Sequence, residues 1–307
     1  MSDITSVMRG RIPNDNEQKG ATMDIPVKEA LIKNAGDLKV LPFVARKVLD
    51  TIGDERSSVS DLSEVIEKDQ TISARVLKIS NSALYGLRQE VTSVHHALLL
   101  LGFKTIRSLV LSVSTKSLYK QFGMKEKIIW DHSVGAAIAS KIVAVGFGSE
   151  VEEMAFIGGL MHDIGKVVLN NETPEAFSEV IMKIYNDGIY SMDAEEEMYG
   201  YNHAEIGAKV AEKWGFPARL VKIIANHHLT VEHLDEIGDS IEARSIACVN
   251  ISDNICKVLG IGYRDPDESL SLVEMPSAVF LNLDKAKLDE LVQKIDQAYV
   301  NEKSAFD

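Results

Sequence analysis

Apolar residues along most of this chain recur at spacings of three and four, and almost no segment alternates as a half-buried strand does. Residues typical of helix ends agree with this pattern in the first half. Ser93 is placed to cap the start of one helix, and Gly102 is placed to end it. The sequence therefore predicts an all-α fold. The helices expected in the first half cover residues 43–52, 60–66, 71–80, 94–101 and 104–119.

A second set of helical segments begins near Trp130. Six of the ten residues at positions 135–144 are small, namely Gly135, Ala136, Ala137, Ala139, Ser140 and Ala144, so a neighbouring helix can approach closely there. Asn202 and Glu205 form a predicted capping box, and Pro217 opens a helix that ends in two histidines. Further helices are expected over 152–161, from Thr173 as cap and Pro174 onward, over 240–257 and over 283–300.

The pattern divides the chain into four parts. Residues 1–24 lack apolar periodicity and contain Gly, Pro and Asn-Asp, which predicts a disordered leader. Two helical lobes are expected over 25–125 and 126–262, followed by a C-terminal helical extension over 263–307. The leader and the extension are too short to hold a further signalling domain, so input is expected to come from a ligand or a separate protein.

The composition and charge of the chain argue against some classes of partner. The chain has 307 residues, 45% of them hydrophobic, which can fill a sizeable core. Its net charge of −13 repels phosphate backbones and anionic lipid, so neither nucleic acid nor membrane is an expected partner. Cys248 and Cys256 are separated by about 12 Å of expected helix, too far for a disulfide, so both should be reduced. These features, with no apolar run near the roughly 20 residues of a membrane span, indicate a cytoplasmic protein.

The candidate chemistry centres on His162 and Asp163 within GGLMHDIGK, where one helical run ends and the next begins. An imidazole and a carboxylate at such a junction can face one cavity and suit a divalent metal. Asp253 stands on an otherwise apolar helical stripe, where an ionised carboxylate needs a cation or a hydrogen-bond network. The candidate ligands, an N/O set suited to one or two ions of Fe, Mn, Zn or a similar metal, are His132, His162, Asp163, His203, His227, His228 and Asp253.

Each of these residues also has a purely structural explanation. His132 and His203 could form hydrogen bonds in the first turns of their helices, and His227 and His228 could favour the negative end of theirs. Asp253 could pair with a Lys or Arg. All seven could then form a metal-free polar network.

The order and spacing of the seven residues resemble the HD superfamily of metal-dependent phosphohydrolases. The HD-GYP phosphodiesterases of that superfamily bind two or more metals, but the Gly-Tyr-Pro loop expected after their His-His pair is replaced here by LTVEHLDEIG at residues 229–238. A Glu that can add a third metal would fall at Ile128. The resemblance implies one metal held by His132, His162, Asp163 and Asp253, a second held by His203, His227 and His228, and a catalytic role for Asp163 and Lys166.

A closer resemblance, over about residues 31–259, is to the HDOD family, the HD-related output domains of bacterial signalling proteins. Its motifs here are Leu41-Pro42, NSALYG at 81–86, the Ser93–Gly102 segment, MHDIGK, HAEIG and a Trp-x-hydrophobic-Pro turn at 214–217, in family order. Asp69-Gln70 stands where the family has Asp-Pro. The resemblance implies two helical lobes, the C-terminal one an HD-type bundle.

Two functions follow from these resemblances. The first is a signal-transduction module that binds a metal or small ligand and acts on a signalling protein partner through protein–protein contacts. The alternative is an active phosphohydrolase or phosphodiesterase with two metal ions bridged by Asp163 and with Lys166 contacting a phosphoryl oxygen. Its ligand would be a phosphorylated small molecule or a nucleotide. Whether the protein is an enzyme stays open at this point.

Overall fold

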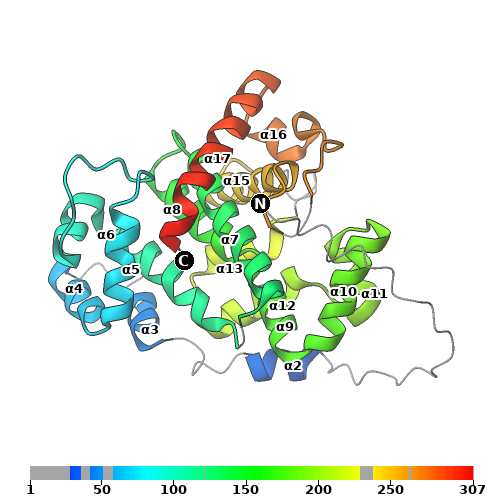
Figure 1. The fold of residues 1–307 in the computed structure, drawn as a ribbon, viewed down its shortest axis with the longest axis horizontal. Coiled ribbons are helices and arrows are strands. Elements are labelled where there is room, and N and C mark those ends of the chain that lie inside the picture. Colours follow the sequence, from blue (N-terminus) through cyan, green and yellow to red (C-terminus); the bar gives the residue numbers. More distant parts are fainter. Residues whose placement is uncertain are drawn as a thin grey trace.

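The computed structural model describes residues 28–35, 42–50, 58–120, 122–228, 238–262 and 265–306, and every regular element in these ranges is a helix. The all-α prediction is therefore confirmed, and the ribbon shows two helical lobes side by side (Figure 1). The predicted leader over 1–24 and nearly all of the LTVEHLDEIG segment lie outside the described residues.

The described residues of the first lobe form four α-helices, and local sequence accounts for several of their ends. Ser58 and Asp61 form a capping box, and the Asp69 side chain accepts from the first turn of the next helix. The Asn81 side chain donates to the Val91 carbonyl and accepts from the Val91 amide, so the NSALYG junction has a structural role. The helices are α3 (Phe43–Asp50), α4 (Val59–Glu67), α5 (Gln70–Ser80) and α6 (Val94–Thr115), followed by the 3-10 turn η2 (Lys116–Leu118).

Gly102 interrupts α6 as predicted, with φ 82° and ψ 162°, a conformation that residues with a Cβ rarely adopt. The two helices expected on either side of it instead adjoin as one kinked element. Residues 94–118 are long and apolar enough to cross a membrane by length and composition, as a buried core helix also is. In this chain, 61% of the most apolar window lies buried against other helices.

The second lobe packs around α7. Gly159 brings α8 against it so closely that a Cβ there would lie 2.5 Å from the Ala136 carbonyl oxygen and 2.6 Å from Ser140 Oγ. The expectation of close helix approach over 135–144 is confirmed. The helices are α7 (Met124–Val143), α8 (Ser149–Met161), α9 (Ile164–Glu172), α10 (Pro174–Asp187), α11 (Ser191–Tyr199), α12 (His203–Lys213), α13 (Ala218–Asn226) and α15 (Ile241–Val258).

The two ends of the described chain pack in different places. Helix α2 (Lys28–Ala35) packs on α9 and α12 of the second lobe (Figure 1). Lys28 pairs there with Glu205. After η3 (Leu272–Glu274) and α16 (Pro276–Phe280), helix α17 (Lys285–Phe306) packs on α7 and α5, and so touches both lobes. It extends the helix expected over 283–300.

A buried ion pair also joins the lobes. Arg107 on α6 donates to Glu153 on α8 over 2.7 Å, and both residues are more than nine-tenths buried. Beside it, the Lys141 ammonium lies 3.4 Å from the centroid of the Tyr85 ring. Burial lowers the pKa of Lys141 to about 8.

Two local expectations hold only in part. Thr173 is the N-cap residue of α10 and Pro174 its first helical residue, as predicted, but the Thr173 hydroxyl forms no cap bond because it donates back to the Leu169 carbonyl of α9. The Asn202 side chain accepts from the Glu205 amide, but the reciprocal bond of a capping box is not formed. Cys248 and Cys256 are both buried and free, as expected.

Candidate metal centre

The structure brings all seven predicted ligand residues into one cluster inside the second lobe, close to Asp163. His132 does not lie in a first helical turn, because α7 begins at Met124 rather than near Trp130 and places it in the helix interior. The others lie where their local sequence puts them. His132 is on α7, His162 and Asp163 between α8 and α9, His203 at the start of α12, His227 and His228 at the end of α13, and Asp253 on α15.

Two glycines bring α9 and α12 into contact beside the HD junction, which we define as His162 and Asp163. A Cβ on Gly165 would lie 1.9 Å from the His203 carbonyl oxygen, and one on Gly207 would lie 3.1 Å from the Gly165 amide nitrogen. Side chains at either position would separate the helices. The HDIG and HAEIG motifs therefore set the distance between Asp163 and His203.

Asp163 is at the centre of the cluster and is 1% exposed. Its Oδ2 lies 3.3 Å from His162 Nε2 and 3.7 Å from His132 Nε2. Its Oδ1 lies 3.1 Å from His203 Nε2 and 3.9 Å from His227 Nε2. One carboxylate thus faces imidazoles on both sides.

Asp253 lies on the side of Asp163 that faces His132 and His162. Its Oδ1 lies 3.1 Å from His132 Nε2, and the residue is 2% exposed. The Oδ2 atom accepts from the Lys257 ammonium over 2.7 Å. The sequence suggests that Asp253 either pairs with a Lys or Arg or serves as a metal ligand. In the structure it pairs with Lys257 and also lies among the candidate ligands.

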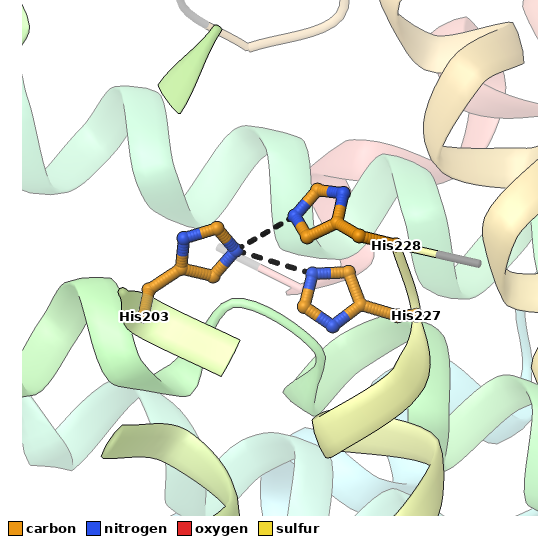
Figure 2. Close-up of side chains that lie close together, drawn as sticks. All are labelled: His203, His227 and His228. Carbon is orange, nitrogen blue, oxygen red and sulfur yellow. Dashed lines mark hydrogen bonds between the residues drawn. The ribbon is translucent and has the colours of Figure 1, made fainter. Parts of the chain in front are cut away.

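The second side is a group of three histidines. His203 Nε2 lies 3.2 Å from His227 Nε2 and 3.0 Å from His228 Nε2, with all three rings converging (Figure 2). The ligand atoms of this group lie within 4.8 Å of one another, as do those of His132, His162 and Asp163. The cluster therefore offers two adjoining groups of metal-ligand atoms.

The orientation of the rings follows from their other nitrogens. Nδ1 of His132 lies 3.0 Å from the Ile261 carbonyl oxygen, and Nδ1 of His162 and His227 each lies 2.7 Å from the carbonyl three residues earlier. A carbonyl oxygen only accepts, so each Nδ1 carries the proton. Nδ1 of His203 likewise faces the Glu195 carboxylate at 2.6 Å. In their neutral forms all four imidazoles present an Nε2 lone pair to the cluster, the arrangement that metal-binding histidines adopt.

Two buried atoms of the HD junction test whether a metal fits. Among the described residues, neither His162 Nε2 nor Asp163 Oδ1 has a hydrogen-bond partner. Unsatisfied buried polar atoms are costly, and converging lone pairs repel unless a cation lies between them. With nitrogen and oxygen donors and no thiolate, the set suggests a divalent metal.

Electrostatics keep most of these groups in the protonation state that metal binding requires. Burial and the neighbouring imidazoles hold the pKa of His227 and His228 well below its ordinary value, so both rings are neutral. Burial alone would raise the pKa of Asp163 and Asp253, but nearby histidines and lysines hold it well below the ordinary value, so both are ionised. Burial has the largest single effect on the pKa of His203 and would lower it, but the carboxylates of Glu195 and Asp163 together outweigh burial and raise this pKa.

Glu195 is the main residue that the sequence does not reveal. It is fully buried on α11, and its carboxylate accepts from both the amide and Nδ1 of His203. In sequence it opens a run of three glutamates, Glu195 to Glu197, which resembles an ordinary solvated helix face. Only the packing of α11 against the start of α12 shows that it orients a candidate ligand.

The cluster opens onto a cavity of about 270 Å³. Lys166, which is 4% exposed, donates to Asp163 Oδ2 over 2.8 Å and also lines this cavity. The first turn of α11 forms part of the opposite wall. A small molecule in the cavity would therefore meet candidate ligands, two lysines and the carboxylates of Asp193 and Asp267. The residues contributed by the cluster are His132, Lys166, His228, Asp253 and Lys257.

Solved structures share this fold. An HDOD domain protein of unknown function from Geobacter sulfurreducens is 23% identical, with TM-score 0.72 over 91% of this chain and 98% of its own. A protein from Shewanella amazonensis, provisionally named a phosphohydrolase, is 25% identical, with TM-score 0.70 over the same shares. One from Marinobacter aquaeolei, provisionally named a signal transduction protein, is 19% identical, with TM-score 0.70 over 91% of this chain and 65% of its own.

Sequence comparisons agree with the structural ones. An uncharacterised protein from Treponema pallidum is 24% identical over 197 residues, which are 62% of this chain and 38% of that relative's own length. The chain thus spans well under half of this longer relative. A family model described as the HDOD domain matches residues 38–230. Because that match covers more than half of the chain, the protein belongs to the HDOD family.

Proposed function

We propose that this protein is a regulatory HDOD module of a signal-transduction system, and that its second lobe binds two divalent metal ions at the His/Asp cluster. The observation that carries the proposal is the orientation of four imidazoles, each with Nδ1 held by an acceptor and Nε2 directed toward Asp163. Such uniform orientation is not needed for a metal-free network, in which the rings would alternate as donors and acceptors.

The regulatory part of the proposal is supported by family membership and by the Marinobacter relative's name. It is also supported by the way the lobes are joined. Helix α7 carries His132 and packs directly against α17, which in turn reaches α5 of the first lobe. A change in metal occupancy at His132 therefore has a continuous packed route to the surface of the other lobe.

Hydrogen exchange of the full chain, with and without Mn²⁺, tests the proposal. Metal should slow exchange in α7 and α12 and also change it in α5 and α17. The variant Asp163→Ala should show no metal effect at any of these helices. Protection confined to the cluster would contradict a regulatory role while leaving metal binding intact.

The cavity beside the cluster favours a second candidate, a metal-dependent phosphohydrolase. When bound, metal ions supply electrophilic stabilisation of phosphoryl oxygens and a nucleophile at neutral pH. Lys166 would contact a phosphoryl oxygen, and Asp163 would hold both ions in register. Turnover of bis(p-nitrophenyl) phosphate with excess Mn²⁺ tests this candidate. Activity that is lost in Lys166→Met but kept in the surface variant Lys287→Met would support it, and no turnover would count against it.

A further inference from the structure

The Lys257 ammonium group pairs with Asp253, one of the candidate metal ligands. It lies one turn after Asp253 on α15 and donates to Asp253 Oδ2 over 2.7 Å, while 27% of its side-chain surface remains exposed. The other carboxylate of the cluster, Asp163, has its own lysine, Lys166, at 2.8 Å. Each carboxylate is thus already paired with one ammonium group.

These two pairs determine the net charge of the two carboxylates and the two lysines. The two carboxylates contribute −2 and the two ammonium groups +2, so they cancel without any metal. Each divalent ion then adds two positive charges, and the two neutral pairs do not offset them. The region is buried, so like charges repel strongly there. Lys166 is 4% exposed, but Lys257 is half-buried and lines the cavity, so it can turn from Asp253 toward that space.

We propose that Lys257 is a resident counter-ion of Asp253, and that it makes metal binding at the His132 side of the cluster depend on a small oxyanion in the adjoining cavity. This inference rests on the proposed metal centre. A metal that takes both carboxylate oxygens of Asp253, including the Oδ2 that Lys257 holds, displaces the Lys257 ammonium into the cavity, next to Lys166 and the metal itself. An oxyanion there offsets all three charges, so metal and anion each strengthen the binding of the other.

The counter-ion role also lowers the cost of leaving the two carboxylates without metal. Two bare carboxylates, each at most 2% exposed, would strongly destabilise the bundle. With Lys166 and Lys257 in place, each carboxylate keeps a counter-ion when no metal is bound, so metal occupancy can vary as a signal. The input would then be the joint presence of a divalent metal and an oxyanion such as phosphate.

Mn²⁺ binding, followed by the electron paramagnetic resonance signal of the free ion, tests the inference with and without inorganic phosphate. In the wild type, phosphate should raise the apparent Mn²⁺ affinity about tenfold, within the usual range of coupling between two ligands. Lys257→Met should raise the affinity about tenfold without phosphate, because a repelling charge is gone, and should weaken the phosphate effect. Lys257→Arg should behave as the wild type.

Two controls keep the result interpretable. Lys287→Met makes the same change in net charge on α17, where Lys287 pairs with the exposed Glu290 across one turn, and should leave Mn²⁺ binding unchanged. Lys257→Gln replaces Lys257→Met if thermal unfolding shows that the latter does not fold. If the wild type binds Mn²⁺ and the uncharged variants bind it equally well, the counter-ion role is wrong. If no variant binds Mn²⁺, the metal centre itself is wrong and this inference is overturned with it.

Discussion

Replacing Glu195 tests whether the orientation of His203 matters for the centre. The carboxylate is fully buried and accepts three hydrogen bonds, from the His203 amide at 2.7 Å, from His203 Nδ1 at 2.6 Å and from Ser191 Oγ at 2.8 Å. Glu195→Ala leaves the two His203 donors buried without partners, at a cost of about 1–3 kcal/mol each. Groups that orient a metal ligand are typically worth about 10- to 100-fold in metal affinity, or about 1.4–2.7 kcal/mol.

We therefore expect Glu195→Ala to lower the apparent Mn²⁺ affinity about 100-fold and to reduce the free energy of unfolding by about 2–6 kcal/mol. Glu195→Gln, which can still accept from His203, should lose about tenfold in affinity. Calorimetric titration and urea unfolding measure the two quantities. Glu197 supplies the matched control, because it lies on the same helix and pairs with Lys183 at the surface. Affinity of Glu195→Ala within twofold of the wild type would refute the reasoning.

Two substitution tests and one titration check the packing beside the site and between the lobes. Gly165→Ala should destabilise the fold by about 3 kcal/mol in urea unfolding, since its Cβ would meet the His203 carbonyl, and a loss below about 1 kcal/mol would be inconsistent with that contact. Arg107→Met should cost about 3–5 kcal/mol by leaving Glu153 buried and unpaired, and adding Glu153→Leu should restore most of it; no recovery would contradict the pairing. Lys141, labelled by ¹³C reductive methylation, should titrate near pH 8 rather than near 10.5. Its unfolded form binds more protons between these values, so its contribution to stability rises with pH across that window.

Much of the centre could be predicted because its residues sit at helix ends. Helix-end signals in the local sequence correctly placed three parts of the centre. These are the HD junction, His203 after its Asn202 cap, and the His227-His228 pair at the end of α13. Helix ends are signalled by a few neighbouring residues, so short-range sequence is enough. The small residues before Ala144 likewise predicted the close contact of α7 and α8.

The rest depends on contacts between distant segments. Trp130 gave the wrong start for α7, because the capping by Glu126 at Gly123 outweighs the apolar pattern that begins later. Glu195 could not be distinguished from its exposed neighbours by periodicity. The Ile261 carbonyl that orients His132 belongs to a loop 129 residues away, and no local pattern identifies such an acceptor.

Metal content per chain tests the central claim most directly. Protein purified without added metal or chelator, and then reconstituted with Mn²⁺, would be measured by elemental analysis beside Asp163→Ala. Two ions per chain in the wild type, lost in the variant, are expected if Asp163 bridges the two ligand groups. No metal after reconstitution, or equal metal in both proteins, would contradict the centre proposed for this HDOD protein.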